Sequence, residues 1–109
     1  SGQKTLENSM SRKPPPLDLD GAETIAITAL GFLASDGLRL GRFLALTGIG
    51  PAELREVAAT PGLQAAVLDH LLNDESMLLV FTAEAGIDPQ RIGFAHALLA
   101  REQHLRDDA

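Results

Sequence analysis

The chain has 109 residues, a formal net charge of −6 and no cysteine, tryptophan or tyrosine. This length suits one domain and is too short for two well-packed ones. The missing cysteines exclude disulfides, thiolate metal sites and thiol catalysis, and the negative charge disfavours nucleic acid as a partner. Four Phe are the only aromatic residues, so aliphatic side chains must fill the core, which suits packing of helix on helix.

Residues 1–19 are predicted to be a disordered leader. Residues 1–9 are polar and patternless, as expected for the remnant of an expression tag. The prolines at 14–16 predict an extended arm, because proline lacks an amide donor and disfavours helix in the residue before it. The longest nearly apolar stretch, residues 25–34, is too short to cross a membrane. We therefore expect a soluble, cytoplasmic protein with a single helical domain over residues 20–106.

Six helices are predicted from capping and helix-breaking residues. Asp20 and Glu23 fit the N-cap and its reciprocal partner of a first helix, whose apolar face includes Ile25, Ala29 and Leu33. The other helices begin at acidic, polar or glycine caps, often followed by proline, and two of them stop at glycine. The signals are Asp36 and Gly48 around Leu40, Phe43, Leu44 and Leu46; Gly50 with Pro51; Thr60 with Pro61; Asn73 or Asp74 and Gly86 around residues 75–85; and Asp88 with Pro89, in a helix reaching about Leu105.

The apolar run at residues 77–81 fits a buried strand as well as a helix. The polar caps before it and the helix formers after it favour the helix. The expected fold class is therefore all-α, a compact bundle of about six short helices.

An internal repeat follows from a shift of 38 residues, which aligns residues 33–54 with residues 71–92 at eight identical positions out of 22. The matches are Leu33/Leu71, Asp36/Asp74, Leu40/Leu78, Phe43/Phe81, Ala45/Ala83, Gly48/Gly86, Ile49/Ile87 and Pro51/Pro89. Two three-helix units, residues 22–59 and 60–97, with a pseudo-twofold axis between them, are the predicted arrangement. Convergence on common caps and stops is the alternative, but the core identities favour duplication.

The two copies differ on one helix face. The second copy carries Met77, Leu79 and Val80 where the first carries Arg39, Gly41 and Arg42. A helix that is apolar all round is surrounded by protein, and a helix with a polar face meets solvent. We therefore predict that the helix at 75–85 is central and the helix after Asp36 lies at the surface. A homodimer contact through Met77, Leu79 and Val80 is the alternative.

Three arginines form the candidate interaction surface. Arg39 and Arg42 share a helix face, and Arg55 is expected near them across the turn. Such a cluster suits an anion or an acidic protein partner. The alternative is a solvated surface in which the arginines pair with Asp36 or Glu56.

The two turns between helices are a second candidate motif. The residues are Gly48, Ile49 and Gly50 in the first turn and Gly86, Ile87 and Asp88 in the second, each followed by proline. The first turn resembles the glycine hairpin of helix-hairpin-helix DNA-binding modules, in which amides at a helix N-terminus hold a phosphate. Asp88 places a carboxylate where the phosphate would sit, and no lysine follows Lys13. A capped helix turn is the favoured interpretation, and weak nucleic-acid binding is the alternative.

No metal, cofactor or catalytic site is predicted. His70 and Asp74 are four residues apart, but a metal site needs three or four converging ligands. Ser76, His70 and Asp69 are the residue types of a hydrolase triad, yet Ser76 falls in the first turn of a helix instead of an exposed elbow. The expected function is a non-enzymatic protein–protein interaction module with an unknown protein partner.

A longer stretch carries a family resemblance. Residues 71–89, with residues 31–36 upstream, resemble a family of short alphaproteobacterial helical proteins classed as a domain of unknown function. The resemblance covers nearly the whole chain after the proline arm. It implies a compact bacterial cytoplasmic protein, and it brings no catalytic residue, cofactor or substrate.

Overall fold

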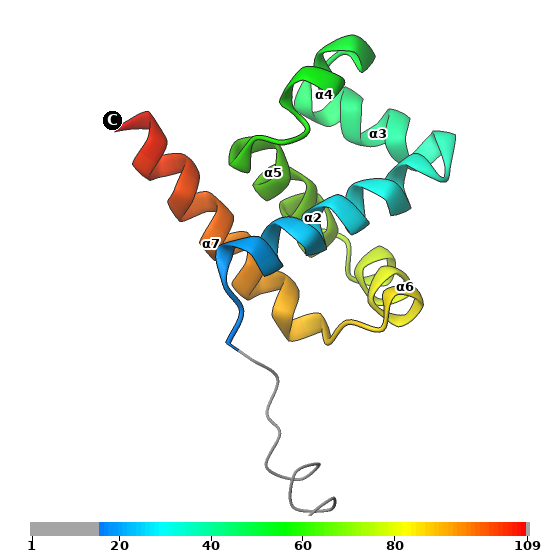
Figure 1. The fold of residues 1–109 in the computed structure, drawn as a ribbon. Coiled ribbons are helices and arrows are strands. Elements are labelled where there is room, and N and C mark those ends of the chain that lie inside the picture. Colours follow the sequence, from blue (N-terminus) through cyan, green and yellow to red (C-terminus); the bar gives the residue numbers. More distant parts are fainter. Residues whose placement is uncertain (1–15, 109) are drawn as a thin grey trace, which may run out of the picture.

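The computed structural model describes residues 16–108; the predicted tag remnant at 1–9 and the first two prolines of the arm lie outside the described residues. Within the described part, the chain folds into six helices joined by short turns, with no strand (Figure 1). The helices are α2 (Leu19–Ala34), α3 (Gly37–Thr47), α4 (Pro51–Val57), α5 (Pro61–Leu72), α6 (Glu75–Ala85) and α7 (Pro89–Asp107). The prediction of an all-α bundle of about six helices is confirmed.

The start of α2 differs from the prediction. Its N-cap is Asp18, whose side chain accepts a hydrogen bond of 2.8 Å from the amide of Gly21. Asp20 lies instead in the first turn, where a carboxylate is favoured by the positive end of the helix dipole. The assignment of Asp20 as the cap was therefore wrong, because a suitable cap residue two positions earlier reaches a free amide at the helix start.

The remaining predicted helix starts and stops are confirmed. Thr60, Asp36, Asp74 and Asp88 accept backbone hydrogen bonds as N-caps, and Gly50 is the N-cap of α4. Gly48 and Gly86 end their helices in the left-handed conformation, with φ of 75° and 68°. These signals are local, so they work wherever the helix later packs.

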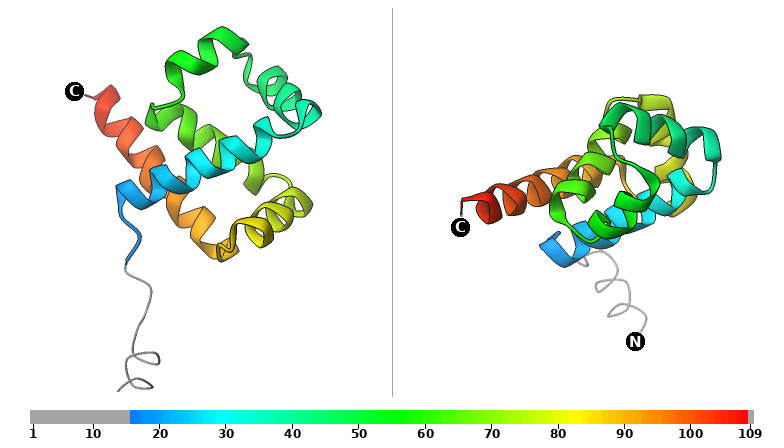
Figure 2. Two further views of the ribbon diagram at one scale, coloured as in Figure 1. Left: turned by 45° about the vertical axis from the view of Figure 1, so that its right-hand side comes forward. Right: turned by 90° about the horizontal axis from the view of Figure 1, so that it is seen from above.

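The centre of the bundle is formed by α2, α5 and α7, which pack on one another (Figure 2). α5 has more buried residues than any other helix, seven of its twelve. Small side chains at the contacts, among them Ala26, Ala65 and Ala95, let the three helices approach closely. The buried core consists of Ala22, Ile25, Ala26, Ala29, Phe32, Leu33, Phe43, Leu63, Ala65, Val67, Leu68, Leu71, Phe81, Ile92, Ala95 and Leu99.

The prediction that α6 is the central helix was wrong. Only Phe81 and Thr82 are buried on α6, and Leu79 and Val80 remain 48% and 42% exposed. Phe81 anchors α6 to α2 through a tilted contact with Phe32, with ring centroids 5.3 Å apart. An apolar sequence allows a helix to be surrounded, but the neighbouring helices decide whether it is, and here they bury more residues of α5 than of α6.

The two predicted repeat units agree in their second helices and differ in their third. Phe43 on α3 and Phe81 on α6 are both buried, and each of these helices begins at an aspartate cap and ends at a left-handed glycine. α4 is short and has no buried residue, whereas α7 packs against both α2 and α5. The proline at position 61 begins the next helix soon after α4 ends, which limits its length. Duplication itself stays a prediction.

Candidate functional site

The outer face of α3 presents three exposed side chains at four-residue intervals. Leu38 is 87% exposed and Leu46 is 72% exposed, and the exposed Arg42 lies between them in sequence. The helical period places residues four apart on the same face, one turn after another. We call Leu38, Arg42 and Leu46 the α3 stripe. The sequence placed Leu46 among the apolar residues of α3 and did not anticipate its exposure; Phe43 is the only buried residue of this helix.

The α3 stripe borders an open groove of about 720 Å³. The groove lies between α3, the C-terminal end of α5 and the first turn of α6. Its lining residues are Leu38, Arg39, Arg42, Leu46, His70, Asn73, Asp74 and Met77. We call this hollow the α3–α6 groove. Arg39 and Arg42 of the predicted arginine surface therefore line a groove between the first predicted repeat unit and the second.

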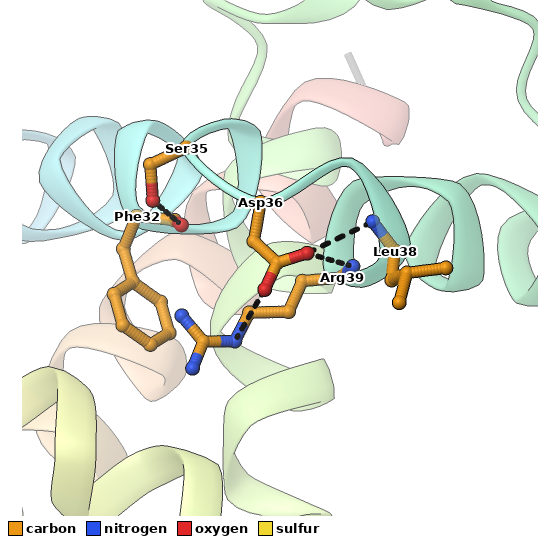
Figure 3. A network of polar contacts seen from close by, with 5 residues as sticks. All are labelled: Phe32, Ser35, Asp36, Leu38 and Arg39. Atoms are coloured by element: carbon orange, nitrogen blue, oxygen red, sulfur yellow. Dashed lines mark hydrogen bonds and ion pairs between the residues drawn. The ribbon is translucent and has the colours of Figure 1, made fainter.

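Arg39 is held by neighbours on its own side of the groove. Its Nε lies 3.9 Å from Oδ2 of Asp36, and its guanidinium carbon lies 4.4 Å from the centre of the Phe32 ring (Figure 3). Asp36 also caps α3, since its Oδ1 accepts a 2.9 Å hydrogen bond from the amide of Leu38. A cation over an aromatic face is attracted by the ring's electron density. Arg39 therefore helps to fasten α3 to α2.

Arg42 has a different environment. It is exposed, and among residues 16–108 no carboxylate lies within ion-pair distance of its guanidinium. The predicted pairing with Asp36 therefore applies to Arg39 and not to Arg42. Arg55 lies on α4 and is not part of the groove lining. Of the three arginines predicted to form one surface, the groove brings Arg39 and Arg42 together and leaves Arg55 apart.

Two half-buried residues of the lining, His70 and Met77, lie outside α3, and we call them the base of the groove. The ring of His70 packs edge-on against Phe43, with ring centroids 5.3 Å apart and an interplanar angle of 74°. Asp74 stands at the α6 side and caps that helix, accepting a 3.1 Å hydrogen bond from the amide of Met77. The groove thus has a basic and apolar wall on α3, an apolar and aromatic base, and a polar wall at the start of α6.

The two candidate turns are built as capped helix junctions. The amide of Gly50 donates to Oε1 of Glu53 at 3.4 Å, and Oδ1 of Asp88 accepts from the amide of Gln90 at 2.9 Å. Ile49 and Ile87 are half-buried against the core, as expected for residues that follow a glycine stop. In both turns a carboxylate therefore lies at the helix N-terminus where a phosphate would have to bind.

The histidines lie in separate places. Nε2 of His96 on α7 is 3.9 Å from Oδ1 of Asp69 on α5, and Nε2 of His104 is 3.2 Å from Oδ2 of Asp108. In the described part of the chain, no three histidine or acidic side chains converge in a way that would hold a metal ion. None of the helices in residues 16–108 has the length and apolar character needed to span a bilayer.

One family of known proteins matches most of the helical region. The model of the family described as "Protein of unknown function (DUF3572)" matches residues 19–102, from the first residue of α2 into α7. The chain belongs to this family. No curated protein and no solved structure matches it. The family match includes every residue that lines the α3–α6 groove, and it confirms the resemblance to a domain of unknown function.

Proposed function

We propose that the chain is a non-enzymatic protein–protein interaction module that binds its partner in the α3–α6 groove. The observation that supports this most directly is the α3 stripe, in which two strongly exposed leucines flank an arginine that has no ion pair with any of residues 16–108. Large apolar side chains grouped at a hollow commonly mark a binding site. Full burial of an exposed leucine is worth about 1.5 to 3 kcal/mol, so two of them provide a substantial part of a binding free energy.

The groove also has the composition of an interface centre. Arginine and methionine are enriched in protein interfaces, and a few side chains there usually supply most of the affinity. Arg42 and Met77 lie in the same hollow with Leu38 and Leu46. His70 adds a flat, partly aromatic surface at the base. A partner segment entering the groove would contact all of these side chains at once.

Other sequence predictions have less support. Nucleic-acid binding at the Gly-Ile-x-Pro turns stays a prediction, and the carboxylates of Glu53 and Asp88 at those helix starts oppose a phosphate. A homodimer through Met77, Leu79 and Val80 also stays a prediction; Leu79 and Val80 are exposed, while Met77 lines the groove. Alphaproteobacterial origin and a cytoplasmic location are likewise predictions from the sequence.

The test compares partner capture by two double variants of the intact chain. Leu38→Glu with Leu46→Glu places two charges in the groove, and Ile27→Glu with Leu105→Glu places two charges on exposed apolar positions of α2 and α7. Each protein is used for affinity purification from the organism that encodes it. Captured proteins are then purified and titrated directly by calorimetry.

We expect a protein that binds the wild type and the control variant directly and loses at least tenfold in affinity for the groove variant. Circular dichroism confirms that both variants stay folded. If every directly binding partner bound the groove variant as well as the control, the α3–α6 groove would not be the binding site.

A further inference from the structure

We infer that the occupant of the α3–α6 groove is an amphipathic helix of another protein, carrying an acidic residue between two apolar residues. The inference rests on the proposed function and concerns the chemistry of the partner. The α3 stripe is apolar at Leu38, cationic at Arg42 and apolar again at Leu46. From Leu38 to Leu46 the helix rises about 12 Å, which a partner helix matches with residues spaced one turn apart.

The charge at the centre of the stripe specifies the acidic residue. Arg39 is already engaged by Asp36 and the Phe32 ring, whereas Arg42 has no carboxylate within ion-pair distance among residues 16–108. The whole chain has 15 acidic and 9 basic residues, but the α3 stripe itself contains one cation and no carboxylate. When the neighbouring leucines are covered, Arg42 is partly withdrawn from water and gains from a carboxylate partner.

The opposite wall fixes which way the partner's acidic residue turns. Asp74 lines the groove and holds the start of α6 through its hydrogen bond to the amide of Met77. Its carboxylate repels an acidic side chain placed on that wall. The acidic residue must therefore face α3, and a polar or basic residue of the partner suits the side of Asp74 and Asn73.

A helix fits this surface better than an extended segment does. Extended peptides gain much of their affinity by pairing with an exposed sheet edge, and the described residues contain no strand. An amphipathic helix satisfies its own backbone and offers apolar residues at one-turn spacing, which pack between α3 and the start of α6. A second copy that met α3 with its own stripe in a symmetric contact would bring Arg42 against Arg42, so a second copy is disfavoured.

The experiment is a pair of selections from one displayed library of amphipathic helices. The library randomises the apolar-face residues and the positions between them. One selection uses the wild-type chain and the other uses Arg42→Glu, each counter-selected against Leu38→Glu/Leu46→Glu so that only groove binders survive. We expect Asp or Glu between two apolar residues in the wild-type pool and Lys or Arg at that position in the Arg42→Glu pool.

Affinities of synthesised winners give the quantitative test. Arg42→Glu is expected to weaken an acidic winner by at least tenfold, and Arg42→Ala by about fivefold. Arg55→Glu makes the same charge change on α4 outside the groove and should leave the affinity within twofold. The loss at Arg42→Ala should shrink as salt is raised, because the ion pair is screened.

The outcomes separate this inference from the proposed function. Groove binders without a charge preference, or with the same preference in both pools, would overturn the acidic-helix inference and leave the groove as a binding site. If neither selection yielded helices that bind in the groove, the inference that the occupant is a helix would be overturned. The partner-capture experiment would still decide whether the groove is a binding site. Sedimentation of the free chain adds one more outcome: a dimer that Arg42→Glu changes and Arg55→Glu does not would identify a second copy and overturn the inference.

Discussion

Replacing the left-handed glycines should destabilise the fold, whereas the same replacement inside the helices should stabilise it. Gly48 and Gly86 have positive φ, and apart from the glycine and its two chain neighbours no heavy atom lies within 4 Å of the position that a Cβ would take on either residue. Alanine at these positions therefore meets no clash, and its cost is only that of the left-handed backbone, about 1 to 2 kcal/mol. Gly41 in α3 and Gly93 in α7 are exposed helix positions with the same free space and ordinary φ. Alanine there should gain about 0.5 to 1 kcal/mol.

The assay is thermal and urea unfolding followed by circular dichroism, since the chain has no tryptophan or tyrosine for fluorescence. For a domain of this size, 1 kcal/mol changes Tm by about 4 to 8 °C. Gly48→Ala and Gly86→Ala should each lower Tm by at least this amount, and Gly41→Ala and Gly93→Ala should raise it by a few degrees. If Gly48→Ala and Gly41→Ala changed Tm in the same direction, the reasoning would be refuted, because it assigns the opposite changes to the different backbone conformations of the two positions.

Three further predictions concern the core, a helix cap and a buried amide. Phe43→Ala should lower the free energy of unfolding by about 3 to 5 kcal/mol, since Phe43 is fully buried and contacts His70; a loss below 1 kcal/mol in urea unfolding would contradict this. Asp74→Ala should lower the free energy of unfolding by about 1 kcal/mol, because the amide of Met77 loses its capping acceptor. Asp74→Asn should leave the free energy of unfolding near that of the wild type, because asparagine caps a helix equally well. Gln64→Met should change the free energy of unfolding by less than about 1 kcal/mol, since it removes the buried Oε1, which has no hydrogen-bond partner among residues 16–108, and also the 3.4 Å hydrogen bond that Nε2 donates to the carbonyl of Ala58; a loss well above 1 kcal/mol would contradict this.

The candidate site was only partly predictable from the sequence. Arg39 and Arg42 were identified by their spacing on one helix face, and both line the groove. The exposure of Leu38 and Leu46 was not foreseen, because a leucine in a helix is more often assigned to the core. A signal was present, since the two leucines share their four-residue spacing with Arg42 and not with the buried Phe43.

The helix boundaries were determined by the sequence itself. Asp74 caps α6 through an amide three residues away, and Gly86 ends that helix through its own backbone conformation. Such signals act over one turn and need no knowledge of distant residues. Even the error at Asp20 was local, because it exchanged one aspartate for another two positions earlier.

Tertiary structure decided which helix is central and which arginine packs on Phe32. The apolar run at 77–81 permits burial, but α5 takes the central place because it packs against both α2 and α7. Arg39 and Arg42 are the same residue type on one helix, yet only Arg39 lies over Phe32 and beside Asp36. These differences depend on where separate helices meet in space. A sequence pattern that spans one helical turn does not determine that position.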